Sequence, residues 1–152
     1  MKKLIIIGIC LVLLIVCLAP FPTRIHITAT GNMISPAGEV LADATLTVKG
    51  WKLNYLFLND TLNVTAEIKN NETKAVQTVE TSGSFFKMDG LLYSPTSGYN
   101  AESNSMYVGQ LVLSTDFQSL FIADTAGKLY VASVDPQQDT ATLVETFQPF
   151  IK

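Results

Sequence analysis

Apolar and polar residues alternate with a period of two over much of the chain. The clearest case is residues 62–68, where Leu, Val, Ala and Ile alternate with polar side chains. Residues 25–29 repeat the pattern with Ile, Ile and Ala. Successive side chains of a β-strand point to opposite faces, so this alternation predicts strands with one buried face. We therefore expect the chain to fold mainly as β-sheet.

Turn-forming residues separate these runs at short intervals. Ala126 and Gly127 predict a tight hairpin, and the polar residues 94–105 predict a loop. Two other runs, residues 53–58 and 129–134, are apolar on both faces, as expected of strands that are covered from two sides. Short strands joined by hairpins favour an all-β fold, either an antiparallel β-sandwich or a meander barrel.

The periodicity changes near the C-terminus. Asp135 followed by Pro136 is typical of the start of a helix. Leu143, Val144 and Phe147 then recur at helical spacing. We expect a short C-terminal helix that packs its apolar side on the sheet, with a terminal strand as the alternative.

An uninterrupted apolar segment begins at Leu4 and ends at Ala19, directly after two lysines. As a helix it rises about 24 Å, slightly less than the roughly 30 Å of a hydrocarbon core. Residues 1–23 are therefore predicted to be a transmembrane signal anchor or a signal peptide. We prefer a single-pass anchor to secretion, because no favourable cleavage sequence follows. The lysines then remain in the cytoplasm and residues 24–152 form an extracytoplasmic antiparallel β-domain.

Composition excludes several functional classes. The chain has 10 basic and 13 acidic residues, a net charge of -3, which excludes a nucleic-acid partner. Its one histidine, His26, and its two cysteines are too few for ordinary zinc sites or Cys–His catalysis. Both cysteines, Cys10 and Cys17, lie in the apolar segment. We expect no metal, no cofactor and no enzymatic activity.

One local motif resembles a catalytic pair. Ser84 and Lys87 match the S-x-x-K pattern of penicillin-binding enzymes, in which the lysine assists deprotonation of the serine. Residues three apart on a strand point to opposite faces, so we interpret the match as a chance one.

Aromatic residues are the remaining candidates for ligand binding. Trp51, Tyr55 and Phe57 alternate, and would share one face of a strand that begins at Trp51. Such a row binds sugar rings or apolar ligands in some proteins and is more often part of the core. Other tyrosines lie around the polar loop and are better placed for a surface contact: Tyr93, Tyr99 and Tyr107.

Two functions are compatible with these features. We expect the domain, held at the membrane by its N-terminal helix, to be a non-catalytic interaction or assembly module with a protein partner in the cell envelope. The alternative is a small-molecule binding protein whose lipocalin-like cavity takes an apolar or sugar ligand. A solid core would argue against the alternative, because a ligand needs an accessible cavity.

Overall fold

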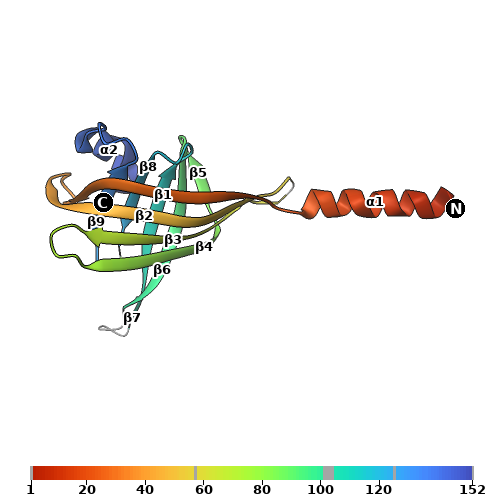
Figure 1. Ribbon diagram of the computed structural model, residues 1–152, viewed down its shortest axis with the longest axis horizontal. Helices are drawn as coiled ribbons and strands as arrows, with labels where there is room; N and C mark the ends of the chain where they lie inside the picture. The colour runs from red at the N-terminus through yellow and green to blue at the C-terminus, as the bar shows by residue number, and fades with distance from the viewer. Residues whose placement is uncertain (1, 57, 101–104, 125, 152) are drawn as a thin grey trace.

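The computed structural model describes residues 2–56, 58–100, 105–124 and 126–151. Within these residues it has a helix at each end of the chain and nine strands between them (Figure 1). The elements are α1 (Lys2–Leu18), β1 (Phe21–Ile34), β2 (Val40–Asn54), β3 (Thr61–Asn70), β4 (Val76–Ser84), β5 (Phe86–Met88), β6 (Leu91–Asn100), β7 (Ser105–Ser114), β8 (Ser119–Ala123), β9 (Leu129–Ser133), α2 (Thr140–Phe147) and the 3-10 turn η1 (Gln148–Phe150).

The nine described strands form one open antiparallel sheet, in the order β4-β3-β2-β1-β9-β8-β7-β6-β5. Most neighbours in the sequence are neighbours in the sheet, and β9 returns to pair with β1. The sheet curls until Glu80 of β4 pairs with Ser97 of β6. The antiparallel prediction is confirmed. The predicted sandwich is wrong, because the β1–β9 pairing joins the described strands into one sheet. The predicted barrel is not fully closed, because a single residue pair rather than a full ladder joins β4 to β6.

Two glycines lie where paired strands approach closely. A Cβ at Gly31 of β1 would collide with the carbonyl oxygen of Val131 in β9. A Cβ at Gly50 of β2, whose φ is 153°, would collide in the same way with the carbonyl oxygen of Asn63 in β3. Glycine is needed at both positions, because a side chain would push the paired strands apart.

The two faces of the sheet carry separate apolar clusters. The inner cluster takes alternate residues from most of the strands and includes Leu46 and Leu111, which are fully buried. The outer cluster lies between α2 and the strands β7, β8 and β9, with the rings of Phe121 and Phe147 centred 5.9 Å apart. β9 is consequently buried on both faces, which confirms the prediction for residues 129–133, whereas Val134 lies beyond the strand and is exposed.

The short C-terminal helix is confirmed, but it begins at Thr140. Its N-cap is Asp139, whose carboxylate accepts a hydrogen bond from the amide of Thr142 at 2.6 Å. Asp135 instead closes a preceding turn by accepting from the amide of Gln137 at 2.9 Å. The predicted start at Asp135 is wrong because the chain makes this separate turn before the helix.

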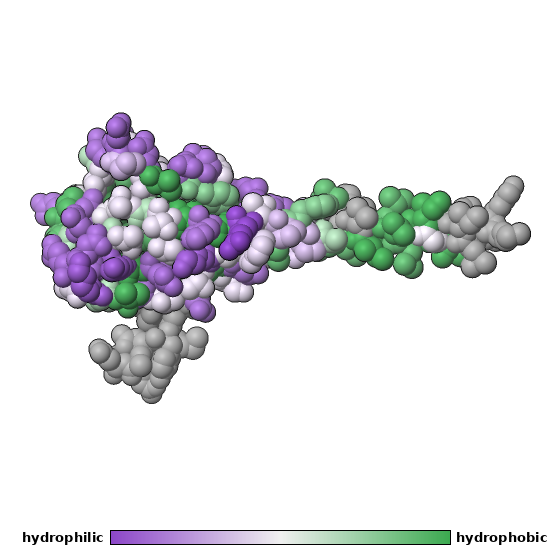
Figure 2. All heavy atoms as spheres, viewed as in Figure 1, coloured by the Kyte–Doolittle hydropathy of each residue, from purple (hydrophilic) through white to green (hydrophobic). Residues whose placement is uncertain are grey.

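α1 extends away from the domain as a separate rod (Figure 1), and its described side chains over residues 7–15 are apolar (Figure 2). Ile7, Leu11 and Leu14 are each 58–60% exposed. The helix has 17 residues, which corresponds to about 26 Å. No helix of the described residues is long and apolar enough to cross a membrane, so the predicted transmembrane span lacks support here.

The predicted strand over residues 53–58, covered from both sides, is wrong. β2 includes only its first two residues, and Leu56 and Leu58 are exposed in the loop that follows. The strand ends because the amide of Tyr55 donates to the carboxylate of Asp60, 2.9 Å away, instead of to a neighbouring strand.

The predicted loop over residues 94–105 is wrong for residues 94–100, which belong to β6, and for Ser105, which begins β7; residues 101–104 lie outside the described residues. Ser94 and Thr96 are buried there on the inner face. The hydroxyl of Thr81 in β4 hydrogen-bonds the Ser94 hydroxyl and donates to the carbonyl oxygen of Pro95 at 2.9 Å. These hydrogen bonds explain how Ser94 is accommodated in the interior of the sheet, whereas the buried hydroxyl of Thr96 has no hydrogen-bond partner among the described residues.

Candidate functional site

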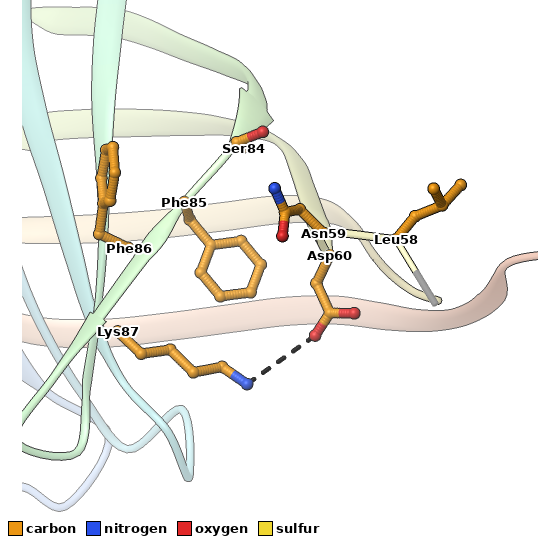
Figure 3. A pocket seen from close by; sticks show the side chains of 7 residues that line it. All are labelled: Leu58, Asn59, Asp60, Ser84, Phe85, Phe86 and Lys87. Atoms are coloured by element: carbon orange, nitrogen blue, oxygen red, sulfur yellow. Dashed lines mark ion pairs between the residues drawn. The ribbon is translucent and has the colours of Figure 1, made fainter. Parts of the chain in front are cut away.

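The end of the domain nearest α1 carries a pocket of about 460 Å³ (Figure 3). It lies where the loop after β2, the end of β4 and the start of β5 meet. The pairing of β3 with β4 brings these distant segments together, because Thr61 pairs with Ser84. The lining residues are Leu58, Asn59, Asp60, Ser84, Phe85, Phe86 and Lys87.

Asp60 is the charged centre of the pocket. Besides accepting from the Tyr55 amide, its carboxylate forms ion pairs with Lys52 at 3.5 Å and with Lys87 at 3.8 Å. The Lys52 side chain is only 17% exposed, whereas that of Lys87 is 62% exposed. The pair with Lys52 is therefore shielded from water, and the pair with Lys87 is a surface pair of small energetic value.

Asn54 connects this charged group to the first strand. Its side chain accepts a hydrogen bond from the Lys52 ammonium group and donates to the carbonyl oxygen of Phe21 at 3.0 Å. It also donates to the hydroxyl of Thr23 at 3.0 Å. Phe21 is the first residue of β1, so the pocket loop is held beside the point where α1 joins the domain.

Phe85 connects the pocket to the core. Its ring packs against the inner cluster. The ammonium groups of Lys52 and Lys87 lie 5.7 and 5.9 Å from the ring centre, within the range of cation–π attraction. The two ammonium groups can lie near the same ring because the Asp60 carboxylate, which pairs with both, offsets their mutual repulsion.

Four exposed apolar side chains lie at this end of the domain, and we call them the α1-side rim. Leu58 and Phe86 line the pocket, Leu56 lies in the same loop, and Phe21 pairs with Asn54. Their exposed fractions range from 51 to 62%. Leu58 points away from Phe85 and Lys87 in Figure 3. Large apolar side chains exposed at one end of a domain are candidates for a contact surface.

The S-x-x-K residues share the pocket without forming a reactive pair. Lys87 directs its ammonium group to Asp60, and no hydrogen bond joins it to Ser84 (Figure 3). In the part of the chain that the structure describes, no group of three His, Cys, Asp or Glu side chains is placed to hold a metal ion. The pocket offers an ammonium group next to aromatic and aliphatic surface.

The predicted row of Trp51, Tyr55 and Phe57 does not form on one strand. Trp51 is exposed on the outer face of β2, opposite Arg24. Tyr55 is half-buried in the loop beyond the strand, and Phe57 lies outside the described residues. Their binding of a ligand stays a prediction.

The other candidate tyrosines belong to β6 and β7. Tyr93 lies on the outer face, where its ring stacks on Phe150 with centres 5.6 Å apart and lies 6.0 Å from Phe86. Tyr99 and Tyr107 are in the β6–β7 hairpin, and their side chains lie outside the described residues. Tyr93 therefore holds the C-terminal residues on the sheet rather than flanking a loop.

Tyr130 lies inside the curled sheet. Burial, together with the nearby Asp124 carboxylate, raises the pKa of Tyr130 to about 12. The residues of the inner cluster around it are at most 6% exposed. An open ligand cavity would leave such side chains accessible, so the described interior is a packed core.

Sequence reasoning missed the charged centre of the pocket. Asn59 and Asp60 look like an ordinary turn, and Lys87 is 27 residues further along the chain. The only local signal was that Asn59 and Asp60 are typical turn residues, and this does not predict which lysines will pair with Asp60.

Comparison with known protein families, curated proteins and solved structures finds no match to this chain. The function is therefore argued from the geometry.

Proposed function

We propose that this chain is a membrane-anchored, extracytoplasmic β-domain that acts as a non-catalytic interaction or assembly module of the cell envelope. The observation that carries the proposal is α1, an apolar helix whose described side chains are exposed rather than packed on the domain. A helix that is apolar all round is stable where its surroundings are apolar. The cell membrane provides such surroundings.

Water is a poor solvent for α1. Burial of one Leu or Ile side chain contributes about 1.5–3 kcal/mol, and α1 exposes several, among them Ile9, Leu11 and Leu13. A helix without tertiary packing also lacks the main source of helical stability in proteins. In lipid the backbone must satisfy its own hydrogen bonds, which favours the helix. Insertion therefore stabilises both the side chains and the helical backbone.

The distribution of charge supports the orientation. Lys2 and Lys3 precede the apolar segment and favour a cytoplasmic N-terminus. Without these two lysines, 8 basic and 13 acidic residues remain, a net charge of -5 for the domain. That charge favours solubility in the aqueous space on the opposite side of the membrane.

The packed core supports an interaction module over the alternative of a lipocalin-like binder. A binder of apolar or sugar ligands needs an accessible interior. The inner cluster leaves its residues at most 6% exposed, whereas the rim residues Leu58 and Phe86 are more than half exposed. Contacts of the module are therefore expected on its outside.

Fractionation of cells that express the full chain with a C-terminal tag tests the proposal. We expect the full-length chain in the membrane fraction after an alkaline carbonate wash, with the tag accessible to protease added outside the membrane. Purification in mild detergent should bring down an envelope protein in constant ratio. A soluble chain, a tag protected inside the cell, or a shorter product in the medium would contradict anchoring. Purification as a single species would contradict the role as a module.

A further inference from the structure

We propose that the α1-side rim rests on the lipid bilayer, so that the domain lies against the membrane surface rather than standing clear of it. This inference rests on the proposed function, because it takes α1 as the membrane anchor. The α1-side rim would then contact the interfacial region of the same bilayer, where the acyl chains meet the headgroups.

The first argument is the short distance along the chain between the anchor and the rim. α1 ends at Leu18 and β1 begins at Phe21, which pairs with Asn54 and accepts a hydrogen bond from its side chain at 3.0 Å. The loop with Leu56 and Leu58 follows directly and lies next to the end of α1 (Figure 1). Anchoring α1 thus brings the loop to the level of the membrane surface.

The second argument is length. At about 26 Å, α1 is slightly shorter than a hydrocarbon core of about 30 Å. A short apolar segment is accommodated when flanking apolar residues continue it or when the bilayer thins. Phe21, Leu56 and Leu58 continue the apolar zone at the C-terminal end of α1, which reduces the mismatch.

The third argument is chemical. Trp51 is exposed and is a residue type enriched at membrane interfaces, and the exposed rings of Phe21 and Phe86 add apolar surface. The lysines nearby are paired with Asp60, so they do not require an anionic headgroup. The rim therefore docks through apolar contact, and a zwitterionic bilayer is sufficient for it.

Tryptophan quenching by lipid in the full, reconstituted chain tests the inference. Trp51 is the only tryptophan, so Trp51→Phe provides a silent background for a new probe. Leu56→Trp places the probe on the rim. Val76→Trp is the matched control, because Val76 is 63% exposed and lies at the opposite end of the β3–β4 hairpin. Both variants are inserted into phosphatidylcholine vesicles with or without bromine on the acyl chains near the headgroups.

We expect brominated lipid to remove most of the emission at position 56 and little of it at position 76, at low and at high salt. Equal, weak quenching at both positions in chains that float with the vesicles would overturn docking and leave anchoring intact. A chain that does not float with the vesicles would overturn anchoring and docking together. Native Trp51 provides a second measurement without a change on the rim, and its emission should be quenched more than that of the probe at position 76.

Discussion

The two described helices, one at each end of the chain, show that the surroundings of a helix matter more than its length. α1 has 17 residues and exposes its apolar side chains, whereas α2 has only 8 and buries Leu143 and Phe147. A helix of 8 residues is not stable alone in water. α2 forms because it has a cap and an apolar stripe that the sheet covers, while α1 has no such partner in the described domain.

The attachments of α2 illustrate what α1 lacks. The hydroxyl of Thr140 donates to the Asn32 side chain of β1 at 2.6 Å. After the helix, the side chain of Gln110 in β7 donates to the carbonyl oxygen of Phe150 at 2.9 Å. Polar contacts at both ends thus position the apolar stripe over the outer cluster.

The largest expected effect comes from removing the central ring of this contact. Phe147→Ala should destabilise the domain by about 3–5 kcal/mol, because a fully buried phenylalanine leaves a cavity. Denaturant unfolding of the full chain in mild detergent measures the loss. Leu13→Ala in α1, at a position 58% exposed, is the control and should leave the midpoint of the domain unchanged. Equal losses would show that α1 also packs on the domain.

A charge introduced into α1 should weaken membrane insertion without lowering the stability of the domain. Leu13→Asp should cost about 2.5–3.5 kcal/mol of membrane insertion while leaving the unfolding midpoint of the domain unchanged. Flotation with vesicles measures the first quantity, and denaturant unfolding measures the second. Val76→Asp, an equally drastic change on the domain surface, serves as the control for flotation. Unchanged flotation of the Leu13→Asp chain would contradict the idea that α1, unlike α2, is stabilised by the membrane.

The polar attachment of α2 predicts a smaller effect. Thr140→Val should lower the stability of the domain by about 0.5–1.5 kcal/mol, because the hydrogen bond to Asn32 is lost. Thr146→Val is the matched control, since its hydroxyl only donates back to the carbonyl oxygen of Thr142 within the helix. If both variants unfold at the same denaturant concentration, the attachment to β1 has no stabilising role.

The smallest expected effect concerns the cap of α2. The amide of Thr142, which donates to the Asp139 carboxylate, holds the pKa of Asp139 below its ordinary value of 3.8. A lowered pKa means that the charged cap stabilises the folded domain above the unfolded pKa, and that this contribution is lost as pH falls through the folded pKa. Asp139→Asn keeps a neutral cap without this dependence. As the pH falls from about 5 to about 2, the free energy of unfolding of the unsubstituted chain should therefore approach that of the Asp139→Asn variant. If the free energies of unfolding of the two chains differ by the same amount at every pH, the cap does not contribute to the loss of stability in acid.

Local chemistry explains which parts of the fold could be predicted. The alternation in residues 25–29 and 62–68 places apolar side chains on the inner face, as observed. The hairpin before β9 is equally local, because the Asp124 carboxylate accepts from the amides of Ala126 and Lys128, both at 2.8 Å. Such features depend on residues a few positions apart.

The features that were missed depend on pairing between distant segments. Ser94 looks like a loop residue until Thr81, in another strand, provides its hydrogen-bond partner inside the sheet. Leu58 looks like a core residue until the end of β2 is known to leave it in the exposed loop. The candidate site could not be predicted for the same reason, because Asp60 meets Lys87 only through the β3–β4 pairing.

Only Ala19 and Pro20 separate α1 from β1, which determines how far the domain can move. The reach of a flexible tether grows with the square root of its length, and two residues, one of them proline, form almost none. Any tilt or rotation of the helix is then passed directly to the sheet. In the proposed anchored state the domain would therefore keep a fixed height and orientation relative to the membrane, and any partner would have to bind it in that position.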